Sequence, residues 1–166
     1  MALHIQQATI NDIKTIRELT FKSWPQTYAS ILTQPQIEYM LEMMYSETEL
    51  TKQIQQENHS FIIAQENSKS LGFASFSEIA QGIWKLHKIY ILPESQGHGI
   101  GRFIINYIIK QIIPRGATAL QLNVNRQNPA KSFYEKMDFK IIREEDIPIG
   151  NGYFMNDFIM EKQLKA

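Results

Sequence analysis

The sequence predicts a single α/β domain, residues 1–166, in which one β-sheet carries helices. Short apolar segments with strand-like alternation recur between segments whose apolar residues are spaced three and four apart, as in helices. A glycine-rich stretch, residues 96–102, joins the most apolar strand segment to the clearest helix. A chain of 166 residues that is 43% hydrophobic is long and apolar enough for one domain with a sizeable core.

The first half of the chain is expected to fold in the order β-α-α-β-β-β. Its predicted strands are residues 3–9, 60–65, 71–78 and 83–92. After the first strand, apolar residues with helical spacing predict a helix that Thr9 or Asn11 caps and that Trp24-Pro25 ends. A second helix is expected after Pro35. The polar residues 66–70 suggest a hairpin, and Pro93 ends the last strand.

The second half is expected to continue as α-β-α-β-β. Its predicted strands are residues 119–124, 138–144 and 153–162. From Ile100 the apolar residues follow the i, i+3, i+4, i+7 spacing of one helix face, and Pro114 and Gly116 stop that helix. Asn128-Pro129 predicts the start of another helix, because Asn is a strong N-cap and Pro is favoured at the first helical position.

The composition excludes several classes of function. Lys plus Arg and Asp plus Glu both number 17, so the zero formal charge argues against nucleic acid as the main partner. The absence of cysteine excludes disulfides, thiolate catalysis and cysteine zinc sites. The N-terminal residues lack the pattern of a signal peptide, and no window approaches the ~18 apolar residues of a membrane span. We therefore expect a cytoplasmic protein with no membrane partner.

The stretch Gln96-Gly97-His98-Gly99-Ile100-Gly101-Arg102 is the most informative motif. A strand, a glycine loop and a helix form a phosphate-binding arrangement, because the loop N–H groups converge and the helix N-terminus is partly positive. A P-loop would need Gly-Lys-Ser/Thr, and a dinucleotide fingerprint would need G-x-G-x-x-G with a later acidic residue. Both fit poorly. A glycine-rich tight turn is the structural alternative.

Residues 96–101 resemble the pyrophosphate loop, Gln/Arg-x-x-Gly-x-Gly/Ala, of the GCN5-related N-acetyltransferases (the GNAT family). Residues 89–94 resemble the strand that enters this loop, and residues 128–139 resemble a second family segment, with Asp138 where glycine is usual. The resemblance covers essentially the whole chain. It implies the GNAT fold, a mixed, mostly antiparallel sheet of about seven strands flanked by about four helices. Within the family, the chain looks most like bacterial polyamine acetyltransferases of the PaiA type.

The resemblance implies acetyl-CoA as cosubstrate and no metal. Backbone N–H groups of the loop would hold the pyrophosphate, and the strand before it would offer backbone groups to the pantetheine amides, as an added strand does. Asn128 is expected to contact the pantetheine arm, cap a helix, or both. The residues expected to contact acetyl-CoA are Ile89, Tyr90, Ile91, Gln96, Gly97, His98, Gly99, Ile100, Gly101, Arg102, Asn128 and Tyr134.

Tyr134 is the expected general acid, because a phenol can protonate or hydrogen-bond the thiolate that leaves when acetyl moves to nitrogen. Its alternative role is a core aromatic residue. Some family members carry a glutamate base where this chain has Leu86, so that base is absent. His87 and Glu78 are the remaining candidate bases, and His87 has a purely structural role as its alternative.

Trp24, Tyr28 and Tyr153 are expected to line the pocket for the acceptor amine, because aromatic faces suit ammonium groups. Glu38, Glu42 and Asp157 are candidate carboxylates for a polyamine; each has a solvated surface position as its alternative.

The predicted function is acetyl-CoA-dependent N-acetyl transfer to a primary amine by direct transfer. The acceptor is a small amine, with a polyamine favoured, or a peptide amine, and the resemblance also suggests a homodimer. Two alternatives are a non-catalytic acyl-CoA-binding sensor and a nucleotide-binding regulatory domain.

Overall fold

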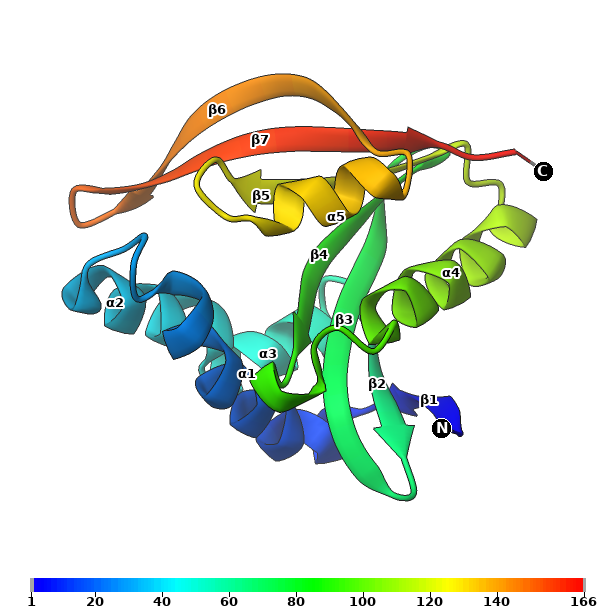
Figure 1. Ribbon diagram of the computed structural model, residues 1–166, viewed down its shortest axis with the longest axis horizontal. Coiled ribbons are helices and arrows are strands. Elements are labelled where there is room, and N and C mark those ends of the chain that lie inside the picture. The colour runs from blue at the N-terminus through cyan, green and yellow to red at the C-terminus, as the bar shows by residue number, and fades with distance from the viewer. Residues whose placement is uncertain (1, 166) are drawn as a thin grey trace.

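The computed structural model describes residues 2–165 and contains one seven-stranded sheet in the order β1-β2-β3-β4-β5-β7-β6. The strands are β1 (Leu3–Ala8), β2 (Ser60–Glu66), β3 (Lys69–Ala80), β4 (Ile83–Ile91), β5 (Ala119–Asn125), β6 (Lys140–Gly150) and β7 (Tyr153–Gln163). Five neighbouring pairs are antiparallel, and β4 and β5 are parallel. Figure 1 shows β5, β6 and β7 with α5 in the upper part of the molecule and β1 to β4 below.

The helices cover both faces of the sheet. They are α1 (Ile13–Tyr28), α2 (Gln34–Tyr45), α3 (Glu47–Gln55), α4 (Ile100–Ile112) and α5 (Ala130–Lys136). One core forms where α4 and α5 pack on the sheet, and it includes Ile104 and Phe139. A second core forms on the opposite face under α1, α2 and α3, around Trp24 and Phe73. The predicted fold class is thereby confirmed. None of the helices in residues 2–165 is long and apolar enough to cross a bilayer.

The structure corrects the predicted number of helices, because α3 was not expected. Ser46 caps this short helix by accepting a hydrogen bond from the Glu49 N–H at 3.2 Å. Its buried residues are only Leu50 and Gln53. A nine-residue helix with so narrow an apolar face gives little periodic signal in the sequence.

The predicted break at Trp24-Pro25 is also wrong, since α1 continues to Tyr28. Pro25 lacks an N–H, but both it and Phe21, whose carbonyl loses that donor, lie on the exposed side of the helix. Water can satisfy that carbonyl there. The extra turn brings Tyr28 to β4, where its hydroxyl lies 2.9 Å from the Tyr90 hydroxyl.

Strand β6 starts later and ends later than the predicted residues 138–144. Asp138 has a left-handed φ of 70°, so it forms the turn before the strand and occupies the position where glycine was expected. Pro148 is tolerated inside the strand because β6 lies at the edge of the sheet.

The two parallel strands part halfway along β4. They are paired only from Ile83–Ala119 to Leu86–Leu122. At this point β4 contains a β-bulge: Phe76 of β3 faces Leu86, Ser75 faces Lys88, and His87 is the extra residue. A bulge bends its strand and disrupts local pairing, so it accounts for the separation. Beyond it, residues 87–91 have no strand partner on the β5 side.

Candidate active site

A cavity of about 780 Å³ opens where β4 and β5 part. Its walls come from the last turn of α1, the second half of β4, the glycine loop, the start of α4, the end of β5, and α5. This volume is within the range of small-molecule and cofactor sites, and divergence of neighbouring strands is a common way to form one.

Two of the loop glycines have a backbone conformation that other residues rarely adopt. Gly97 and Gly99 have φ values of 82° and 78°, and a Cβ at either would meet no atom within 4 Å. Glycine is therefore required by the turn and leaves the cavity side of the loop open. Gly99 directly precedes α4 and provides no side-chain cap. The first N–H groups of α4 are thus free to bind an anion, as the sequence suggested.

Gly101 lines the cavity and also has a packing role. A Cβ there would lie 3.2 Å from Cζ of Phe133 and 3.3 Å from Cδ1 of Ile91. Its small size therefore lets α4 pack closely against β4 and α5. Gln96 ties the loop to β4, because its Nε2 donates to the Ile91 carbonyl at 3.3 Å. The side chains of His98 and Arg102 are exposed and do not line the cavity, which leaves only their backbone for the predicted role.

The free edge of β4 suits an extended ligand. The Leu92 N–H donates to the Leu71 carbonyl of β3 at 2.8 Å. Because successive backbone groups of a strand point in opposite directions, the Ile91 N–H points toward the opening. The side chains of Ile89 and Ile91 pack into the core beneath α4, whereas Tyr90 packs into the opposite core. These contacts engage the side chains in packing, so the backbone is the part of this segment that a ligand could use.

Tyr134 and Asn128 both line the cavity from the α5 side. Tyr134 is only 9% exposed, and its burial, with a contribution from Tyr28, raises its pKa above the usual value. The phenol thus stays protonated at neutral pH and can act as a donor. Asn128 Oδ1 accepts a hydrogen bond from the Ala130 N–H at 2.9 Å, so its predicted capping role is confirmed. Its amide nitrogen remains available to a ligand.

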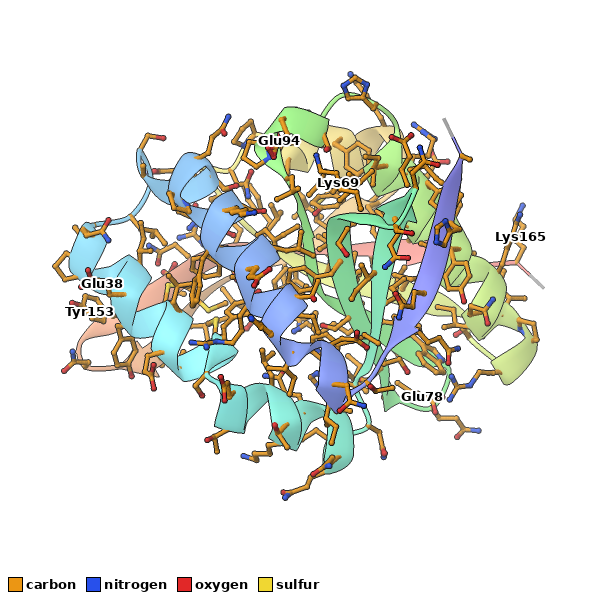
Figure 2. The ribbon with its side chains drawn as sticks, turned by 90° about the horizontal axis from the view of Figure 1, so that it is seen from below. Glu38, Lys69, Glu78, Glu94, Tyr153 and Lys165 are labelled. Carbon is orange, nitrogen blue, oxygen red and sulfur yellow. The ribbon has the colours of Figure 1, made fainter. Side chains whose placement is uncertain are left out.

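Glu78 does not lie with the other predicted residues. Its carboxylate accepts a hydrogen bond from the Gly82 N–H at 3.0 Å and so stabilises the turn between β3 and β4. Figure 2 shows Glu78 at the lower edge of the molecule, far from Glu94, which precedes the glycine loop at the upper edge. Because a general base must reach the proton it removes, this geometry gives Glu78 a structural role.

His87 borders the cavity but is engaged elsewhere. Its Nε2 lies 2.7 Å from Ser77 Oγ, and its ring stacks on His59 with 4.0 Å between ring centroids. Burial, with the nearby charges of His59, Lys85 and Lys88, lowers its pKa to about 3. An imidazole with so low a pKa is a poor acceptor for an ammonium proton. Leu86, where some family members have glutamate, is buried in the core.

Of the three aromatic residues expected at the acceptor pocket, the structure brings only Tyr28 into the cavity wall. Trp24 is 2% exposed and lies beneath it, with 4.6 Å between their ring centroids. Tyr153 packs against Tyr39 of α2 at 5.3 Å, and Figure 2 shows it at the outer edge of the molecule, with Glu38 labelled beside it. Neither Trp24 nor Tyr153 lines the cavity.

The three candidate carboxylates also differ in their position relative to the cavity. Glu38 and Glu42 are exposed on α2. Asp157 is buried on β7, next to the cavity residue Asn123, whose Nδ2 donates to it at 3.3 Å. Sequence reasoning missed Asn123. Its polar side chain alternates with the buried Leu122 and Val124, which was the available signal that it faces away from the core.

Comparison with known proteins identifies the family. The profile of the acetyltransferase (GNAT) domain matches residues 28–155. Over its full length the chain is 31% identical to the full length of a spermidine N(1)-acetyltransferase of Thermoplasma acidophilum. A second relative is a ribosomal protein bS18-alanine N-acetyltransferase of Haemophilus influenzae. The two sequences are 33% identical over an aligned region that covers 57% of this chain and 66% of the relative.

A solved structure has the same fold. The PaiA N-acetyltransferase of Thermoplasma acidophilum, determined in complex with coenzyme A, superposes with a TM-score of 0.83 and 32% identity. The match covers 98% of this chain and 99% of that one. The family and the enzyme class expected from the sequence are thereby confirmed, and the chain is an N-acetyltransferase of the GNAT family.

Proposed function

We propose that this enzyme transfers the acetyl group of acetyl-CoA directly to a primary amine of a polyamine, with both substrates bound at once. The observation that supports it most is the cavity between β4 and β5, which is open both to the glycine loop and to the α1 side. The full-length similarity to a spermidine acetyltransferase supports the choice of acceptor.

Acetyl-CoA fits the residues that are present. The open positions at Gly97 and Gly99, followed by the uncapped start of α4, suit the pyrophosphate. The free edge of β4 at residues 89–91 suits the pantetheine amides, and the Asn128 amide can add a hydrogen bond from the other side. The thioester would then lie near Tyr134 and near the Ile91 N–H, which can polarise its carbonyl oxygen.

The chemical step needs few protein groups. The neutral amine attacks the thioester carbonyl carbon, the C–N bond forms, and the C–S bond then breaks with release of the thiolate. Tyr134 gives its proton to sulfur and regains one from the nitrogen of the new amide. The protonated phenol required for this step is consistent with the raised pKa of Tyr134.

Continuous measurement of free-thiol release from acetyl-CoA tests the proposal. The acceptors should include spermidine, spermine, diamines, amino acids, peptides with N-terminal alanine and aminoglycosides. We expect the highest kcat/KM with polyamines. A preference for peptides would instead align the enzyme with the bS18-alanine relative. Acetyl-CoA binding without thiol release with any amine would favour the acyl-CoA sensor suggested by Leu86.

Two further expectations extend this proposal. We expect the enzyme to form a homodimer and to reside in the cytoplasm. Sedimentation velocity at several protein concentrations tests the first, and fractionation of the source cells tests the second.

A further inference from the structure

Asp157 is a buried carboxylate outside every ion pair found within residues 2–165. It is 4% exposed and lies on β7, directly opposite Asn125 of β5 and Glu145 of β6. Within residues 2–165, its side chain has one hydrogen bond, from Asn123 Nδ2 at 3.3 Å, and no ion pair. A buried charge without a cationic partner is costly, so such a site favours a cation.

The arginines around Asp157 are already engaged. Arg126 pairs with Asp146, and Arg143 pairs with Glu145. Arg126 also donates to the backbone carbonyl of Asp157, at 3.3 Å, rather than to its carboxylate. Lys85 of β4 is the remaining cation nearby; burial lowers its pKa, and the charge of Asp157 opposes that shift. Burial, together with Glu145, raises the pKa of Asp157, whereas Asn123, Lys85 and Arg126 oppose this shift.

The position of Asp157 links this charge to the acceptor side of the cavity. Asn123 and Tyr28 both line the wall, and Asp157 stands directly behind Asn123. The carboxylate is also one cause of the raised pKa of Tyr28, which in turn contributes to that of Tyr134. Tyr28, Asn123 and Tyr134 line one cavity, and Asp157 lies behind its wall through the contact with Asn123.

The hydrogen bond between Asn123 and Asp157 fixes which way the amide points. Because Nδ2 donates to the carboxylate, Oδ1 is left as an acceptor at the cavity wall. The negative charge behind the amide strengthens this acceptor in a low-dielectric site. An alkylammonium group, a strong donor with a positive charge, complements it.

We propose that Asn123 and Asp157 form the binding site for an ammonium group of the acceptor other than the amine that is acetylated, with Asn123 Oδ1 as the contact and Asp157 as the positioning residue that orients the amide and supplies the charge. This inference rests on the proposed use of cationic amines. It identifies the residues that would select them over neutral acceptors of similar shape.

The chain contains a matched control. On the same face, Gln121 Nε2 of β5 donates to Glu161 Oε2 of β7 at 2.7 Å. This second amide–carboxylate pair has the same chemistry, but Gln121 lies where β4 and β5 are still paired and does not line the cavity. Glu161→Gln therefore removes an equivalent charge outside the proposed site.

The test measures spermidine binding to the enzyme–CoA complex by calorimetry, alongside steady-state kinetics. Asp157→Asn should raise the spermidine Kd and KM about tenfold or more, because it removes the charge behind the contact. The acetyl-CoA KM should stay near wild type, and the melting temperature should not fall. Glu161→Gln should leave the spermidine Kd unchanged. The exchange variant Asn123→Asp/Asp157→Asn, which returns the charge to the pair, should restore binding.

The outcomes separate this inference from the proposed activity. Spermidine binding that is equally tight in wild type and Asp157→Asn overturns the inference, whatever the turnover. Binding that depends on Asp157 without any thiol release supports the inference and removes the proposed activity. If wild type binds no spermidine, the inferred site and the proposed polyamine acetylation are both overturned. If Asp157→Asn does not fold, the exchange variant decides, and loss of spermidine binding in that variant overturns the site.

Discussion

The loop end of the cavity takes its residues from one continuous stretch, residues 89–101, whereas the proposed acceptor end combines Tyr28 of α1 and Asn123 of β5, with Asp157 of β7 behind Asn123. The loop end offers mainly backbone groups, in a conformation that two glycines permit. The acceptor end offers side chains that meet only in the folded protein. A binding site built from contiguous backbone can be recognised as a sequence motif. A site built from side chains of distant segments leaves no such motif. Substitutions at each end should therefore affect different substrates.

Tyr134→Phe should have the largest effect, because Tyr134 lies between the two ends. Loss of a general acid should lower kcat about 10²–10⁴-fold. The affinities for acetyl-CoA and for the amine should change little. Because the pKa of Tyr134 is raised, wild-type kcat should show no basic limb from this group up to about pH 10. Tyr107→Phe on α4, which lies outside the cavity, is the control, and a fully active Tyr134→Phe would remove the acid role.

Gly99→Val should damage the loop end alone. A β-branched residue at a φ of 78° costs about 1–2 kcal/mol of stability and distorts the loop, so we expect acetyl-CoA to bind about tenfold more weakly or worse. Gly116 has a φ of 90° and equally open surroundings, far from the loop in the sequence and outside the cavity wall. Gly116→Val should lower the free energy of unfolding similarly and leave the acetyl-CoA affinity intact. Equal loss of affinity in both variants would contradict a specific role for the loop.

Tyr28→Phe should affect the acceptor end by a smaller amount. It removes a hydroxyl at the cavity wall, and loss of one neutral hydrogen bond from that hydroxyl to the amine corresponds to roughly a two- to tenfold rise in amine KM. The acetyl-CoA KM should not change. Tyr153→Phe, at a position that the sequence also suggested but that lies outside the cavity, should leave both constants unchanged. Steady-state kinetics with each substrate varied in turn distinguishes the two.

His87→Gln should have the smallest effect on turnover and should instead change stability. The folded-state pKa of His87, about 3, lies below its ordinary value of 6.5, so the unfolded chain binds a proton first as the pH falls. The stabilising contribution of this group is complete above pH 6.5 and is lost as the pH falls toward 3. Wild type should lose about 2 kcal/mol from this group between pH 6.5 and pH 5, measured by urea unfolding. The variant should lose less, and a large fall in its kcat would restore His87 as a base.

The sequence determined the parts that depend on local chemistry. Residues 96–101 identified the loop, because left-handed turns select glycine and the start of a helix attracts anions. Helical periodicity after Ile100 and the capping residue Asn128 located α4 and α5. The match of motif order to the GNAT family then implied the sheet and the acid Tyr134.

Only the tertiary structure decided what fills the acceptor end. Trp24, Tyr28 and Tyr153 looked equivalent as aromatic residues, but packing buries the first, exposes the second to the cavity and places the third against α2. The bulge at His87 separated the strands, and it results from pairing between β3 and β4 that no local pattern reveals. The role proposed for the charge on Asp157 likewise depends on the residues that the fold places beside it. Side-chain exposure and charge balance depend on which strands and helices become neighbours, and contacts between distant segments set them rather than local propensity.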